Sequence, residues 1–95
     1  MPEMHFRVRW PDGSAQRCYS PSLVIKDFFV PGESYGLADF VERSRTALEI
    51  ASERVRVKYG YGCGHAAHQL AEIERIAAQF GGQADARVTV EAFEE

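Results

Sequence analysis

The clearest pattern in this chain is an alternation of apolar and polar residues near its start. Apolar side chains occupy every second position from Met4 to Trp10, and His5, Arg7 and Arg9 lie between them. This period of two predicts a strand with one apolar and one cationic face. Pro-Asp-Gly at 11–13 predicts a turn, after which residues 14–19 return as an antiparallel edge strand. We interpret the cationic row as the hydrated face of the sheet.

A different period governs the middle of the chain, where apolar and small residues recur every three or four positions. They predict an amphipathic helix from about residue 37 to residue 59, with Gly60 as its natural stop. Ile50 and Val57 are seven positions apart and lie off the main stripe. They predict a second contact, with another helix or with another subunit. The stripe itself consists of Leu37, Phe40, Val41, Ser44, Ala47, Leu48, Ala51 and Val55.

Shorter elements flank this helix on both sides. Ser20 followed by Pro21 has the form of an N-cap and first helical residue, which predicts a short helix of about two turns. The Leu-Val-Ile run that follows also suits a strand, so a β segment stays an alternative. Pro31-Gly32 ends this element in either case, and residues 33–35 are expected to be an extended connector.

The remainder of the chain predicts one helix and one strand. Ala66, Leu70, Ile73, Ala77 and Phe80 form a single narrow seam on a helix from about His65 to Phe80, as expected for antiparallel packing on the first long helix. After Gly81-Gly82, apolar and polar residues alternate again from Arg87 to Phe93 and predict a final strand.

Together these elements predict a single α+β domain over residues 1–95. Its small antiparallel sheet consists of the N-terminal hairpin plus the C-terminal strand, with two long antiparallel helices and one short helix packed on one face. The first strand, the most strictly alternating, is expected at the centre. A three-stranded sheet has exposed edges that a second copy can cover. Together with Ile50 and Val57, these edges predict a homodimer.

Composition excludes several functional classes. The chain has 95 residues, of which 45% are hydrophobic and 26% charged, with a net charge of −3. Such a chain has no basic field, so nucleic-acid binding is not expected. No apolar run approaches the ~20 residues of a membrane span, and the N-terminus lacks the apolar core of a signal peptide. We therefore expect a cytoplasmic protein with Cys18 and Cys63 as reduced thiols.

One turn contains the only dense cluster of metal-ligating and nucleophilic side chains, namely Cys63, His65 and His68. These three could bind Zn²⁺ if Cys18 or His5 of the hairpin supplied a fourth ligand. Their spacing matches no standard zinc motif, however. The favoured interpretation is a half-buried cysteine and two surface histidines, so no metal, cofactor or catalytic residue is assigned.

Cys63 also has features of a nucleophile. It precedes a helix N-terminus, where the helix dipole favours the thiolate, and His65 is close in sequence. Cysteine catalysis also needs an oxyanion hole and a substrate cleft, and a chain of 95 residues offers little room for them. A cysteine-dependent enzyme therefore stays a secondary alternative, and the chain is not expected to be an enzyme.

Four strings in the first two thirds of the chain are specific as a set: YSPS at 19–22, DFV at 39–41, RSR at 43–45 and ASERVR at 51–56. With the hairpin, they resemble a small bacterial family, the nitrogen-starvation-response proteins, whose genes sit in nitrilase gene clusters. The resemblance covers roughly residues 4–80. Such clusters typically also encode a nitrilase, a radical-SAM protein, an acetyltransferase-like protein, a flavoprotein and a synthase-like protein.

The resemblance implies a role in assimilating nitrogen from nitriles or cyanide, with no molecular activity assigned and no catalytic residues to carry over. From it we predict a non-catalytic accessory or binding protein whose partners are proteins of the nitrilase cluster. The alternatives are a small-ligand or metal-binding module that uses the Cys63–His68 turn, and a cysteine-dependent enzyme.

Overall fold

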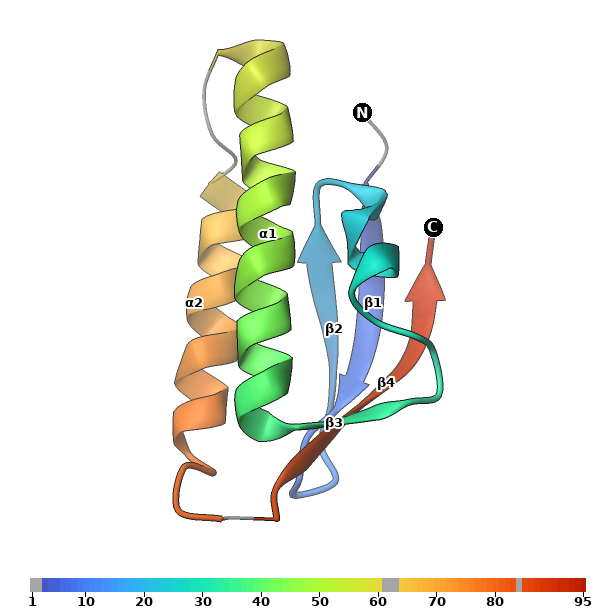
Figure 1. Ribbon diagram of the computed structural model, residues 1–95, viewed down its shortest axis with the longest axis vertical. Coiled ribbons are helices and arrows are strands. Elements are labelled where there is room, and N and C mark those ends of the chain that lie inside the picture. The colour runs from blue at the N-terminus through green and yellow to red at the C-terminus, as the bar shows by residue number, and fades with distance from the viewer. Residues whose placement is uncertain (1–2, 61–63, 84) are drawn as a thin grey trace.

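The computed structural model describes residues 3–60, 64–83 and 85–95. A four-stranded antiparallel sheet forms one layer, and two helices cover one of its faces (Figure 1). The predicted α+β class is therefore confirmed. The elements in chain order are β1 (Met4–Arg9), β2 (Ala15–Ser20), η1 (Leu23–Asp27), β3 (Ser34–Gly36), α1 (Leu37–Tyr59), α2 (Gly64–Ala78) and β4 (Arg87–Glu94).

The sheet has the strand order β2-β1-β4-β3. As predicted, β1 lies inside the sheet, between its hairpin partner β2 and the C-terminal strand β4. Phe6 of β1 lies opposite Cys18 on one side and opposite Phe93 on the other. Alternate residues of β1 are fully buried beneath the helices, which is the reason for its strict apolar period.

The fourth strand, β3, corrects the prediction of a three-stranded sheet. The expected connector pairs in register with the first three residues of β4. The Gly32 N–H donates to the Val90 carbonyl at 2.7 Å, and the Val90 N–H donates to the Glu33 carbonyl at 3.0 Å. Three residues are too few to show a period of two. The strand therefore forms because it pairs with β4, far away in the sequence, and the local sequence pattern does not predict it.

The short helix begins two residues later than predicted. Ser22 caps it, accepting a hydrogen bond from the Val24 N–H at 3.3 Å, and the helix is a 3₁₀ segment over Leu23–Asp27. Ser20 is instead the last residue of β2, opposite Met4. Because this pairing holds Ser20 in an extended conformation, the helix cannot start there. The helix is confirmed over the β alternative, but Ser20 as its cap is wrong.

The two long helices follow the predicted pattern closely. α1 ends at Gly60, whose φ of +85° and N–H bond to the Arg56 carbonyl at 2.7 Å make a left-handed cap. α2 returns antiparallel beside α1 (Figure 1). It ends at Ala78, slightly before the expected Phe80, but Phe80 is still buried in the turn that follows.

Aromatic rings fill the space between the helices and the sheet. The Phe40 ring of α1 contacts Trp10 edge-on, with 5.5 Å between ring centroids, and lies 5.4 Å from the Phe29 ring. Phe29 also stacks on Phe6 of β1 at 6.0 Å. Phe40 and Phe29 are almost completely buried, so this cluster joins α1, the loop after η1 and the sheet into one core.

Candidate functional site

The predicted Cys63–His68 turn is described only from Gly64 onward, and Cys63 lies outside the described residues. His65 and His68 are exposed in the first turn of α2, as the structural interpretation expected. The His65 ring contacts Tyr19 of β2 edge-on, with 5.9 Å between centroids. Tyr19 also contacts His5 of β1 at 5.6 Å. Tyr19 thus has contacts with two of the residues considered as zinc ligands.

Cys18, another residue considered as a zinc ligand, is buried. The side chain lies in the core with none of its surface exposed. Burial, and to a smaller extent the negative charge of Glu72, raise the pKa of the Cys18 thiol from 9.0 to about 12. A thiol with that pKa is neutral at physiological pH, so it is neither a nucleophile nor a ready metal ligand. Across 3–60, 64–83 and 85–95, no three His, Cys, Asp or Glu side chains are placed to hold a metal ion.

Gln69 of α2 is a buried polar residue that sequence reasoning missed. Its Oε1 accepts a hydrogen bond from the Tyr19 N–H at 2.9 Å, which satisfies a backbone donor of β2 on the outer side of this edge strand. Gln69 is 9% exposed, and its buried Nε2 has no hydrogen-bond partner among the described residues. The sequence could have indicated this role, because Gln69 lies between Ala66 and Ile73 on the apolar face of the helix, where a side chain is expected to point into the core. The contact locks α2 onto the sheet edge.

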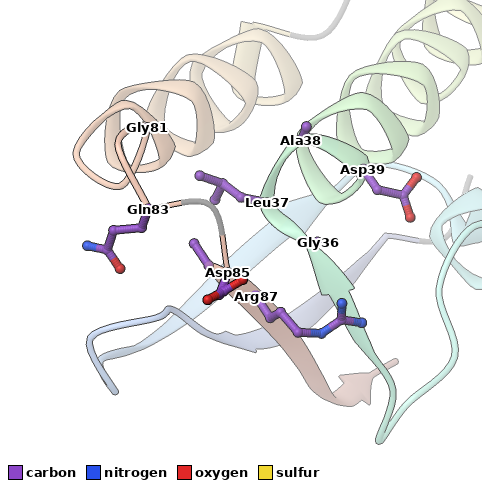
Figure 2. A pocket seen from close by; sticks show the side chains of 9 residues that line it. Gly36, Leu37, Ala38, Asp39, Gly81, Gln83, Asp85 and Arg87 are labelled. Carbon is purple, nitrogen blue, oxygen red and sulfur yellow. The ribbon is translucent and has the colours of Figure 1, made fainter.

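A shallow hollow of about 460 Å³ opens where α1 begins (Figure 2). Three segments meet there: the β3–α1 junction, the loop after α2 and the start of β4. The Leu37 N–H donates to the Ala86 carbonyl at 3.1 Å, and Arg87 donates to the Ser34 hydroxyl and carbonyl. The lining residues are Gly36, Leu37, Ala38, Asp39, Gly81, Gln83, Asp85, Ala86 and Arg87.

The hollow at the start of α1 contains charged groups of both signs. Its charged groups are two carboxylates and one guanidinium, and the guanidinium is already bound to the backbone and side chain of Ser34. Among the residues that the structure describes, the lining contains no cysteine, histidine, serine or lysine. Such a surface offers polar contacts to a partner but lacks a nucleophile with an adjacent base.

Two arginines on the outer face of the sheet form ion pairs with carboxylates of β4. Arg9 of β1 forms an ion pair with Glu91 at 2.8 Å, and Arg17 of β2 forms one with Glu94 at 2.9 Å. Arg9, one of the three cationic residues predicted for this face of β1, is therefore paired with a carboxylate of β4. This agrees with the interpretation of the cationic row as a hydrated face. Among the helices that the structure describes, none is long and apolar enough to cross a membrane.

Comparison with known protein families identifies the family of the chain. The sequence model of the nitrogen starvation-induced protein NitG matches residues 5–93. The chain belongs to the NitG family. The family match extends through β4 to residue 93, beyond the part on which the resemblance rested, so the sequence of the C-terminal strand also belongs to the family pattern. No curated protein and no solved structure matches the chain.

Proposed function

We propose that this NitG-family chain is a non-catalytic accessory protein that binds enzymes of a nitrile- or cyanide-assimilation pathway. Membership of a nitrogen starvation-induced family supports the physiological setting. The link to nitriles and cyanide rests on the resemblance to proteins encoded in nitrilase gene clusters. The partners are then the enzymes of such a cluster.

The observation that carries the binding role is the disposition of the charged side chains. Carboxylates and guanidinium groups of the described residues pair with one another along the surface. The Arg45 guanidinium, for example, joins Glu42 of its own helix and Glu74 of α2, each at 2.8 Å. Exposed pairs of this kind contribute little to stability, typically below about 1 kcal/mol. A charged group of a partner protein can therefore replace one member of such a pair at little cost. Among the described residues, the hollow at the start of α1 brings together two carboxylates and a guanidinium but no histidine, cysteine or lysine that could act as a general base or nucleophile.

A pull-down from nitrogen-starved cells tests this proposal. The tagged chain serves as bait in cells grown on a nitrile as nitrogen source, and in ammonium-grown cells as the control. We expect a cluster enzyme to be recovered only from the starved culture. A second bait with Asp85→Lys reverses a charge in the exposed wall of the hollow at α1 and asks whether that surface takes part. Recovery of the bait alone from starved cells would contradict the accessory role.

One observation favours the second candidate function, a small-ligand or metal-binding module. Tyr19 contacts both His5 and His65, so a histidine of the hairpin and a histidine of the predicted turn lie against the same ring. Elemental analysis of protein purified without a tag or chelator tests this function. Stoichiometric zinc that disappears in a His65→Ala variant would support it, and metal-free protein would count against it.

The third candidate, a cysteine-dependent enzyme, depends on Cys63 because the Cys18 thiol is buried and neutral. Titration of thiol reactivity against pH in a Cys18→Ala variant isolates Cys63. A reactive thiolate well below pH 8 would support this alternative, and an ordinary or unreactive thiol would leave the enzyme without a nucleophile.

A further inference from the structure

α1 has an apolar pair of side chains beside the face that packs on the core. Ile50 and Val57 are seven residues apart, nearly two helical turns, so they point in almost the same direction. Ile50 is half-buried, and Val57 is 75% exposed. With Glu53, Arg54 and Lys58 they line a hollow of about 420 Å³ on the helix surface. An exposed apolar hollow bordered by charges is typical of a docking surface.

The charges beside this pair separate by sign, apart from Arg56, which lies on the acidic flank and pairs with Glu53. At about 100° per residue, Glu49 and Glu53 lie on one flank of the Ile50–Val57 line, and Arg54 and Lys58 lie on the other. The structure agrees with this assignment. Glu49 lines a second hollow that it shares with residues of α2, whereas the Arg54 guanidinium donates to the Ser22 hydroxyl at 3.0 Å on the η1 side. The acidic flank thus faces α2, and the basic flank faces η1.

The charge pattern of this helix face is complementary to that of a second copy of the same face. When two identical helices pair in parallel about a two-fold axis, the left flank of one meets the right flank of the other. The Glu49 and Glu53 carboxylates of each copy then face the Arg54 and Lys58 cations of the other copy. These contacts occur twice by symmetry. In an antiparallel pair, like flanks meet, so carboxylates would face carboxylates and cations would face cations.

We propose that a second copy of this chain docks on the Ile50–Val57 face, with the two α1 helices parallel. Ile50 and Val57 stack against their own symmetry copies, and four reciprocal ion pairs flank them. Glu53 pairs with Arg56 of its own helix in the free chain, at an exposed i,i+3 contact. Such a contact contributes little and exchanges readily for a partner on the second copy.

The contact is small, so the dimer is weak. Two apolar layers and their rim bury less surface than the roughly 1,200 Å² of a standard interface. We therefore expect a dissociation constant on the order of 10–100 μM, weakening in high salt because four ion pairs contribute. The dimer is independent of the proposed accessory function, since the hollow at the start of α1 stays exposed in both copies.

Sedimentation equilibrium between 10 and 500 μM tests the association. We expect the average mass to rise toward that of a dimer, and Val57→Lys to keep the chain monomeric at 500 μM. A charge-swap pair makes the test specific. The Glu49→Lys/Glu53→Lys variant and the Arg54→Glu/Lys58→Glu variant should each be monomeric alone and form a 1:1 dimer when mixed. Wild type that is monomeric at 500 μM would overturn the proposal.

Cross-linking tests the orientation. In a Cys63→Ser background, Val57→Cys should form a disulfide-linked dimer under mild oxidation, because equivalent positions face each other in a parallel pair. Tyr59→Cys, on the other side of α1, is the matched control and should stay monomeric. An antiparallel pair would instead cross-link Ile50→Cys with Val57→Cys and leave Val57→Cys alone unlinked, and that result would overturn the parallel arrangement.

Discussion

The buried Cys18 thiol predicts a distinct dependence of stability on pH. Burial raises the pKa of this thiol from 9.0 in the unfolded chain to about 12 in the folded protein. Between these values the unfolded chain loses its proton and the folded protein keeps it. Because the folded state then binds more protons, the free energy of unfolding falls as pH rises above 9. The contribution of the neutral thiol is complete below pH 9 and is lost toward pH 12.

The size of the effect follows from the same pKa difference. Three pKa units correspond to roughly 4 kcal/mol across the full range, of which roughly 1–2 kcal/mol is lost by pH 10. Replacing Cys18 with alanine removes the titration and leaves a small cavity, which costs roughly 1 kcal/mol at pH 7. The variant should therefore be less stable than the parent at pH 7 and equally or more stable at pH 10.

Urea unfolding at both pH values measures this crossover. Parent and Cys18→Ala variant are compared in a Cys63→Ser background, so that no second thiol titrates. Tyrosine and lysine side chains also titrate near pH 10, but they are common to both proteins, and their effect cancels in the difference. A stability difference that stays constant between pH 7 and pH 10 would refute the buried, neutral thiol.

Three further substitutions test the fold by thermal or urea unfolding. Phe40→Ala empties the centre of the aromatic core and should cost about 3–5 kcal/mol; a loss below 1 kcal/mol would contradict the packing. Gly60→Ala places a side chain at a φ of +85°, where its Cβ meets no atom of the described residues within 4 Å beyond the adjoining backbone, so backbone strain alone should cost about 1–2 kcal/mol. An unchanged midpoint would show that α1 does not end in this left-handed cap. Ser22→Ala removes the acceptor for the Val24 N–H and should cost about 1 kcal/mol, whereas Ser20→Ala leaves that cap intact. A cap at Ser20 would be indicated if Ser22→Ala had no effect.

The long elements could be predicted from the sequence because their burial is periodic. Strand β1 and helix α1 each bury one continuous face, and β1 lies at the centre of the sheet as its strict alternation predicted. Strand β3 could not be predicted, since its three residues are held by pairing with β4 at the far end of the chain. The cap at Ser22 was missed for a related reason: pairing with Met4 keeps Ser20 in the strand.

The candidate site was less accessible to sequence reasoning. The two thiols look alike in the sequence, but Cys18 lies under the helices with a pKa of about 12, which only the tertiary environment produces. Gln69 likewise has ordinary helix-forming character, and its role depends on the Tyr19 N–H fifty positions away. Tyr19 of β2 contacts His5 of β1 and His65 of α2, and the spacing of residues along the sequence does not predict contacts between three separate elements.

Consumption of nitriles and cyanide tests the central claim most directly. It is measured for the purified chain alone, and for extract of nitrogen-starved cells that lack its gene, with and without the chain added back. An accessory protein predicts no turnover by the chain alone and restored turnover in the extract, equally with a Cys63→Ser variant. Turnover by the purified chain that the Cys63→Ser substitution abolishes would contradict the account and establish an enzyme.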